Sequence, residues 1–271
     1  MAEPPLFTAP AAPRFGADDV VFDSVTVREW GIRKFGRTVV ARTRIKCSDR
    51  SYFAERKNML ELLTQGEYAL FMVILFAIIF SLTFHEFGHA LVAKLYGDDT
   101  AQRLGRLTLN PISHIDPLGL LMVVMVGFGY AKPVPFTAHN LRYPWASALV
   151  AFAGPFMNLV LAVLAINLYV WGANSGLEFF QGPGPATLLI YLAHINLLLM
   201  LFNLIPLGPL DGHHILPHLL PPSLGRRYLE LNARYGVGVF LVLIVLSVMG
   251  VPIFRTLMDL SAGIMPLITL F

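Results

Sequence analysis

The sequence predicts an α-helical polytopic membrane protein with about five to six apolar segments, and three observations support this fold class. Of the 271 residues, 56% are hydrophobic and only 14% are charged, whereas about a quarter of an average soluble domain is charged. The mean hydropathy is +0.64. Several apolar runs reach the roughly 20 residues that a helix needs to span a bilayer. The single cysteine, Cys47, excludes an internal disulfide and any multi-cysteine metal site.

Residues 1–60 are expected to form a polar N-terminal extension. The first 17 residues contain four prolines and few bulky apolar side chains, a composition typical of disorder. Residues 18–48 are rich in Val, Ile, Thr and aromatic residues, which favours a small β-hairpin or sheet. Eleven of the 20 Lys and Arg residues lie between positions 14 and 57. We interpret them as the charges of a solvated sheet, and a surface for lipid headgroups is the alternative.

The apolar segments follow a short helix expected at 51–65. Four of them indicate membrane spans, at residues 68–96, 145–171, 186–207 and from 237 to 248. Two more are less regular, because the run at 117–130 is short and Arg255 and Asp259 interrupt the run at 251–271.

Two stretches between the spans, 100–117 and 129–144, are rich in Gly, Pro and Asn but too apolar for ordinary solvent loops. Non-helical backbone at membrane depth survives only where it is buried in protein or lines a wet cavity. We therefore expect membrane-embedded strands or loops there. The prolines of 131–136 favour extended backbone, and a free strand edge could pair with an unwound substrate.

Ionisable residues lie inside the first long span, in the sequence His85-Glu86-Phe87-Gly88-His89. On a helix, positions i and i+4 share one face about a turn apart, so the two imidazoles can bind one metal ion. Glu86 can reach a metal-bound water without binding the metal. Zinc would lower the pKa of that water to about 7, and Glu86 would accept its proton and pass it to the leaving amine. A pair of structural histidines is the alternative, but ionisable groups within lipid usually mark function.

A catalytic zinc takes three protein ligands and keeps one open position, so a third ligand must come from another segment. The stretch LFNLIPLGPLDGHH at 201–214 closes a later span and offers Asp211 and His213. Asp211 lies among prolines and glycines that break the helix, where a carboxylate can turn inward. We expect Asp211 to be the ligand and keep His213 as the alternative, whereas His214 and His218 are expected at the membrane interface.

Other polar residues within or between the spans have two interpretations each. The GPFMN sequence that ends at Asn158 indicates either close packing beside the active site, with Asn158 bonding an embedded loop, or a small-residue helix contact. His114 is expected to bond Asp116 rather than to reach the site. His194 and Asn196 are expected to join neighbouring helices.

Taken together, these motifs resemble the site-2 proteases, which are intramembrane zinc metalloproteases. The similarity extends from about residue 80 to residue 216 and includes HEFGH, LTLNPISHIDPLG, GYAKPVPF, AGPFMN and NLIPLGPLDG. The resemblance implies one Zn²⁺ per chain, with a general base and three ligands: Glu86 is the base, and His85, His89 and Asp211 are the ligands. It also implies that Asn203, eight residues before Asp211, holds the substrate or the developing oxyanion.

The predicted function is hydrolysis of peptide bonds within or near the transmembrane segments of other membrane proteins, as in regulated intramembrane proteolysis. Single-span proteins or signal-peptide remnants are the expected substrates, the lipid bilayer is the expected surrounding, and no nucleic-acid partner is expected. The expected location is the plasma membrane of a prokaryote. Two alternatives are a metal or solute transporter and an inactive relative that grips membrane helices.

Three regions are expected along the chain. They are the polar extension at 1–60, a metalloprotease core at 61–216 and C-terminal membrane segments at 217–271, which would include a lateral gate for substrates. The orientation in the membrane stays open. The basic N-terminus favours the cytoplasm by the positive-inside rule, whereas the resemblance implies the opposite, and neither the substrate nor the oligomeric state follows from the sequence.

Overall fold

The structure, a computed structural model, describes residues 59–126 and 129–270, and every regular element in these ranges is a helix. The predicted α-helical fold class is therefore confirmed. Of the helix expected at 51–65, the described part forms α1 (Met59–Thr64). The β unit expected at 18–48 lies outside the described residues.

Among the described residues, four helices are long and apolar enough to cross a membrane. They are α2 (Tyr68–Leu95), α5 (Ala146–Asn174), α7 (Pro183–Asn203) and α9 (Pro222–Val248). They correspond to the four predicted spans. The start of α9 differs from its prediction, since the helix begins at Pro222 and the span was expected from residue 237. The first turns of α9 carry polar, helix-compatible residues, which do not form an apolar run.

The two irregular apolar runs form shorter helices. The run at 117–130 contains α4 (Pro117–Val126), whose ten residues are too few to span a bilayer. The last run contains α10 (Ile253–Ile264) and a 3₁₀ turn, η3 (Met265–Leu267). The remaining elements are single turns or short helices: α3 (Thr100–Arg103), η1 (Pro111–Ser113), η2 (Ala138–Asn140), α6 (Glu178–Gln181) and α8 (Gly212–Leu219).

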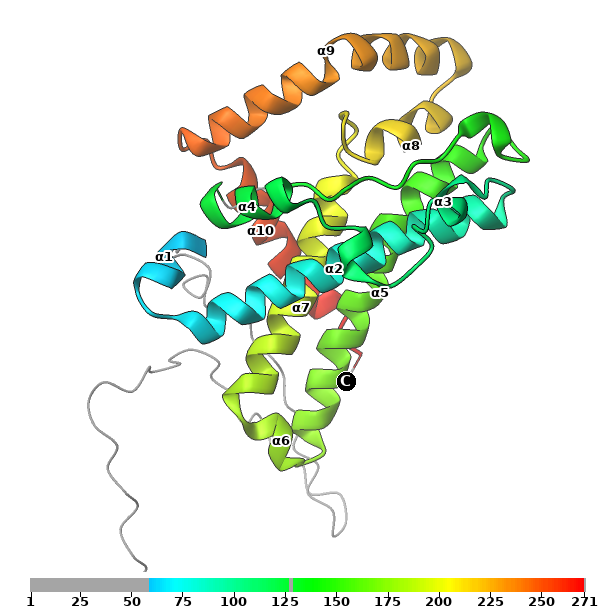
Figure 1. Ribbon diagram of the computed structural model, residues 1–271. Coiled ribbons are helices and arrows are strands. Elements are labelled where there is room, and N and C mark those ends of the chain that lie inside the picture. The colour runs from blue at the N-terminus through cyan, green and yellow to red at the C-terminus, as the bar shows by residue number, and fades with distance from the viewer. Residues whose placement is uncertain (1–58, 127–128, 271) are drawn as a thin grey trace, which may run out of the picture. The chain divides into compact units, whose positions relative to one another are not determined.

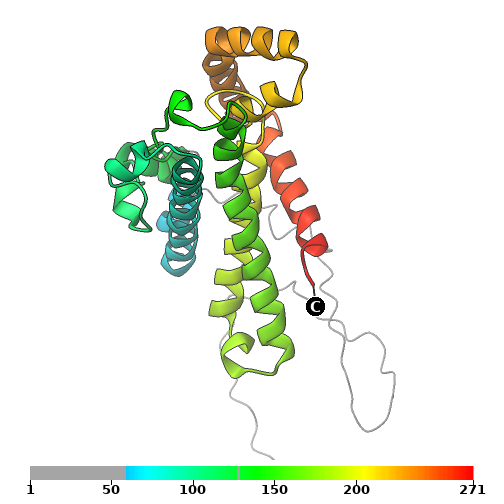
Figure 2. The same ribbon diagram turned by 90° about the vertical axis from the view of Figure 1, so that its right-hand side faces the viewer.

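Helices α5 and α7 lie side by side and are joined at one end by α6, and α2 packs against both at a steep inclination (Figure 1). Helix α10 packs against α7 on the side away from α2 (Figure 2). The contact between α5 and α7 is built largely from small side chains, including Ala162, Ala165 and Ala193, with Leu197 packed among them. Small residues let membrane helices approach closely, which favours dispersion contacts between their backbones.

A buried polar cluster crosses the three central helices. Asn158 of α5 donates through Nδ2 to Asn196 Oδ1 of α7 at 2.8 Å, and Asn196 Nδ2 donates to Ser81 Oγ of α2 at 2.8 Å. In addition, a hydrogen bond of 3.2 Å joins Ser261 Oγ of α10 and His194 Nδ1 of α7. The expectation that His194 and Asn196 join helices is confirmed. These bonds fix how α2, α5 and α7 are rotated against one another, which positions the site.

Candidate active site

Helix α2 brings His85 and His89 together, as the i, i+4 spacing predicts. Both imidazoles are buried, and their Nε2 atoms are 3.0 Å apart. Both Nδ1 atoms are engaged on α5. His85 Nδ1 lies 2.6 Å from Asn158 Oδ1, and His89 Nδ1 lies 2.7 Å from the carbonyl oxygen of Val150.

These partners determine which ring nitrogen carries the hydrogen. A carbonyl oxygen only accepts, so Nδ1 of His89 must donate. The same holds for His85, because the Nδ2 of Asn158 is already donating to Asn196 and its Oδ1 is left to accept. In the neutral form of each ring, Nε2 is then left with its lone pair, and the two Nε2 atoms face one another. That arrangement is repulsive by itself and favourable around a cation.

Asp211 completes the group from the loop between α7 and α8. Its Oδ2 is 3.2 Å from His85 Nε2 and 3.5 Å from His89 Nε2, and this buried oxygen has no hydrogen-bond partner. Zinc bonds nitrogen and oxygen at about 2.0–2.1 Å, so tetrahedral ligand atoms are about 3.3 Å apart. The three separations, 3.0, 3.2 and 3.5 Å, lie around this value. The residues present therefore fit a bound zinc ion.

The alternative ligand, His213, is not part of this group. Its Nδ1 donates to the carbonyl oxygen of Leu210 at 2.5 Å, and its ring lies against that of His214 in a tilted arrangement with 3.7 Å between centroids. The geometry therefore favours Asp211 over His213. Residues 204–211 have left the helix, which lets the Asp211 carboxylate turn back toward α2.

Glu86 is buried beside the two histidines and is held by a single backbone group. Its Oε2 accepts a hydrogen bond of 3.1 Å from the N–H of Val134, in the extended segment 131–136. The same segment is tied to the preceding loop, where Lys132 N donates to the His114 carbonyl oxygen at 2.8 Å. The N–H groups of Lys132 and Val134 are thus engaged, and no described residue in this stretch forms a strand. Pairing of 131–136 with an unwound substrate stays a prediction.

The extended segment is anchored by Asp98, a fully buried carboxylate just beyond the end of α2. Asp98 accepts from the N–H of Thr137 at 2.5 Å, from Asn140 Nδ2 at 3.2 Å, and from both the N–H and the hydroxyl of Thr100. Burial by itself raises the pKa of Asp98, but these hydrogen bonds outweigh it and hold the pKa below its usual value. Sequence analysis missed this residue, although Asp-x-Thr after a helix is a local sign of an Asx turn.

Gly154 and Asn158 of α5 lie directly beside the two histidines. A Cβ added at Gly154 would overlap the rings of both His85 and His89, so only glycine leaves room for the imidazoles. Of the two interpretations, packing beside the site is the one observed. Asn158 bonds His85 and not an embedded loop, which corrects that part of the prediction.

His114 differs from its prediction. Its Nε2 bonds the carbonyl oxygen of Thr108 at 2.8 Å. Asp116 instead accepts from the N–H groups of Leu118 and Gly119 and so caps α4. The pairing of His114 with Asp116 was wrong because the carboxylate satisfies the free amides at the start of the helix.

Asn203 is the last residue of α7 and is half-buried. Its Nδ2 donates to the carbonyl oxygen of Leu199, one turn earlier in the helix, at 3.0 Å. This bond belongs to the helix and not to the histidine group, so a role for Asn203 in catalysis stays a prediction.

Comparison with known proteins supports the same conclusion as the geometry. The family model for peptidase family M50 matches residues 73–182 and 179–247, which hold the HEFGH helix, the loop of Asp211 and most of α9. The chain belongs to peptidase family M50. The resemblance to site-2 proteases is thereby confirmed, and so is the enzyme class, an intramembrane metallopeptidase.

The relatives of this M50 peptidase carry matching names. YwhC of Bacillus subtilis, named as a zinc metalloprotease, is 42% identical over 175 residues, which cover 64% of this chain and 80% of YwhC. Rip2 of Mycolicibacterium smegmatis, also named as a zinc metalloprotease, is 34% identical over 191 residues, covering 66% of this chain and 67% of Rip2. The predicted zinc cofactor agrees with these names and with the His85–His89–Asp211 group. No solved structure gives a significant match to the chain.

Proposed function

We propose that His85, His89 and Asp211 bind one Zn²⁺ and that Glu86 is the general base for hydrolysis of peptide bonds inside the membrane. The observation that carries the proposal is the convergence of two imidazole Nε2 atoms and one unpartnered carboxylate oxygen within zinc-ligand distances of one another. The three residues come from two separate segments, so local helix structure does not account for the arrangement.

The residues of the chain have separate tasks. When bound, zinc supplies a water with a pKa of about 7 and polarises the scissile carbonyl. Glu86 accepts the proton of the attacking water and later delivers it to the leaving amine. The Val134 N–H holds Glu86 Oε2, which limits the carboxylate to a narrow range of orientations. Asn203 is proposed to donate to the substrate carbonyl oxygen as negative charge develops there.

The substrates we propose are single-span membrane proteins or signal-peptide remnants, cleaved in the plasma membrane of a prokaryote. His85 and His89 lie within a membrane-spanning helix and are buried, which supports a scissile bond below the lipid surface. A helical substrate must unwind there, because its own hydrogen bonds otherwise shield each peptide bond. We propose that the C-terminal region 217–271 opens laterally to admit it.

The test is a cleavage assay in liposomes with a panel of single-span substrates. Wild-type protein should cleave and contain one zinc per chain, and Glu86→Gln should keep the zinc but lose activity by about 10²- to 10⁴-fold. A chelator should abolish cleavage, and added zinc should restore it. Active protein without bound metal, or full activity of Glu86→Gln, contradicts the proposal. A transporter would predict metal or solute flux that Glu86→Gln leaves intact.

A further inference from the structure

The loop that carries Asp211 is held from outside by α9. The hydroxyl of Tyr228 donates to the carbonyl oxygen of Pro206 at 2.9 Å. One helical turn further, Asn232 Oδ1 accepts a hydrogen bond of 2.9 Å from the N–H of Gly208. Because Gly208 is three residues before Asp211, both bonds act on backbone that leads directly into the proposed metal ligand.

Helix α9 faces the protein along one narrow stripe. Buried or half-buried residues recur every three to four positions along it, from Gly225 through Tyr228, Asn232, Gly236 and Phe240 to Ser247. Most other α9 residues are exposed. The attachment of this long helix therefore depends on few contacts, and two of them are the hydrogen bonds to the 204–211 loop.

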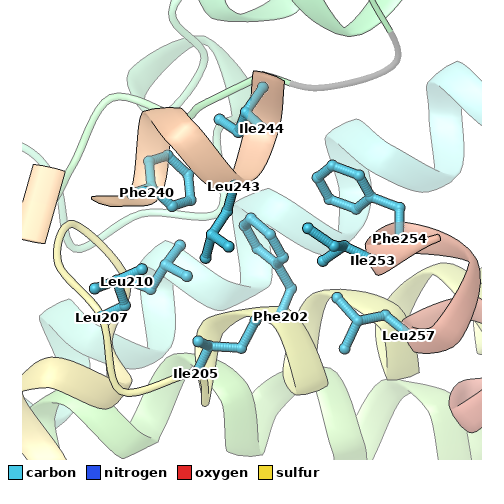
Figure 3. Close-up of a pocket in the computed structure, with 10 residues that line it drawn as sticks. All are labelled: Phe202, Ile205, Leu207, Leu210, Phe240, Leu243, Ile244, Ile253, Phe254 and Leu257. Carbon is cyan, nitrogen blue, oxygen red and sulfur yellow. The ribbon is translucent and has the colours of Figure 1, made fainter. Parts of the chain in front are cut away.

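The stripe has a polar half and an apolar half. Beyond Asn232, Phe240 and Leu243 approach Phe202 of α7 and Leu210 of the loop around a small apolar cavity of about 20 Å³ (Figure 3). The rings of Phe202 and Phe240 have centroids 6.1 Å apart. Apolar packing is non-directional, so this half lets α9 adhere to the loop without setting the position of its backbone. The hydrogen bonds of Asn232 and Tyr228 are directional, so they set the position of the loop backbone.

Two glycines make room for the Asn232 amide. A Cβ added at Gly208 would lie 2.8 Å from Asn232 Nδ2, and a Cβ added at Gly236 would overlap Asn232 Oδ1. By contrast, a Cβ added at Gly238, on the same helix, would meet no atom within 4 Å. The Asn232 side chain thus lies between the Gly208 backbone of the loop and the space left by the missing side chain of Gly236 in α9.

We propose that Asn232, seated between Gly208 and Gly236, is a positioning residue that fixes the 204–211 loop against α9 and so presents Asp211 to the two imidazoles. The inference rests on the proposed function only in taking Asp211 as a metal ligand. Metal ligands must be held within about 0.5 Å of their productive geometry, and a loop outside helical structure needs external bonds to achieve this. The position of the outer helix is thereby coupled to the metal centre.

The experiment compares four variants of the full-length protein in nanodiscs. Asn232→Leu removes the acceptor with a side chain of the same branched shape, and Gly236→Ala displaces the amide while leaving Asn232 in place. Asn232→Asp keeps an acceptor oxygen for the Gly208 N–H, and Gly238→Ala is the matched helix control. Amide hydrogen exchange of residues 204–211 is measured in metal-free protein, and zinc affinity is measured by competition with a chelator.

Asn232→Leu and Gly236→Ala should both accelerate exchange in the loop and weaken zinc binding by about tenfold or more. Asn232→Asp and Gly238→Ala should resemble the wild type in both measurements. The inference is overturned if the first two variants leave loop exchange or zinc affinity unchanged, or if Gly238→Ala has the same effect as Gly236→Ala. A wild-type protein that binds no zinc would refute the proposed function, while the exchange data would still report on the loop.

Discussion

Asn158 Oδ1 accepts a hydrogen bond from His85 Nδ1 at 2.6 Å, although the two residues are 73 positions apart in the chain. The bond orients the imidazole and leaves its Nε2 lone pair directed at His89 and Asp211. Bonds of this kind from a neighbouring side chain to a metal-binding histidine both fix the ring and increase its basicity. The precision of the site therefore depends on α5 as much as on α2.

Replacing Asn158 should weaken zinc binding, while the protein still folds in the membrane. Asn158→Leu leaves His85 Nδ1 without its acceptor, and we expect a loss of zinc affinity of about 10- to 100-fold in a chelator competition. The matched control is Asn167→Leu, which removes another buried asparagine of α5 that bonds the Leu270 N–H instead of the histidines. Equal zinc affinity of the two variants would show that Asn158 does not orient His85.

The identity of the third ligand can be tested with one pair of variants. Asp211→Asn replaces the charged carboxylate by a neutral amide, which is a weaker metal ligand. We therefore expect the purified protein to lose its zinc and its cleavage activity. His213→Gln should retain both, since the His213 ring is engaged with Leu210 and His214. Metal analysis by mass spectrometry decides between them. Retention of zinc by the first variant and its loss from the second would reverse the assignment.

Gly154 should tolerate no side chain. Gly154→Ala places a methyl group against the rings of His85 and His89, which forces the imidazoles off their shared metal position. We expect activity and zinc affinity to fall by at least about tenfold. Gly184→Ala, where an added Cβ meets no atom within 4 Å, should behave as the wild type. A fully active Gly154→Ala protein would contradict the described packing.

Asp98 should matter for activity although it lies outside the HEFGH motif. Asp98→Asn turns one acceptor into a donor that faces the Thr137 and Thr100 donors, at a cost of about 1–3 kcal/mol for the unsatisfied groups. The segment that bonds Glu86 through Val134 then loses its anchor, and we expect lower kcat with a smaller change in KM. Asp99→Asn, next in sequence but exposed and paired with Arg103, is the control. The same kcat for both variants would argue against the anchor.

The contribution of Asp98 to stability should depend on pH in one direction. Its folded pKa lies below the ordinary carboxyl value of 3.8, so the stabilisation is fully present above that value and is lost as the pH falls through the folded pKa. The difference in unfolding free energy between wild type and Asp98→Asn should stay constant above pH 3.8 and shrink below it. A difference that grows with acidification would reverse the sign and contradict the hydrogen bonds described.

The sequence by itself determined the local features of this protein. The apolar runs located the spans, because crossing a bilayer requires about 20 apolar residues in a row. The four-residue spacing put His85 and His89 on one face of α2, because helical geometry is set within a single turn. Asp211 was predicted because few carboxylates occur near the ends of apolar segments. The start of α9 was misjudged because hydropathy does not register a polar helical turn.

Only the tertiary structure decided the remaining features. It brought the Asp211 oxygen and not His213 to the imidazoles, paired Asn158 with His85, and placed the Val134 amide on Glu86. It also seated Asn232 of α9 against Gly208. Each of these contacts joins residues that lie 24 or more positions apart in the chain. The contact of Asp211 also depends on how the 204–211 loop folds back. Hydrogen-bond partners at such separations follow from how helices are rotated and packed against one another, and no periodicity within a single segment encodes that rotation.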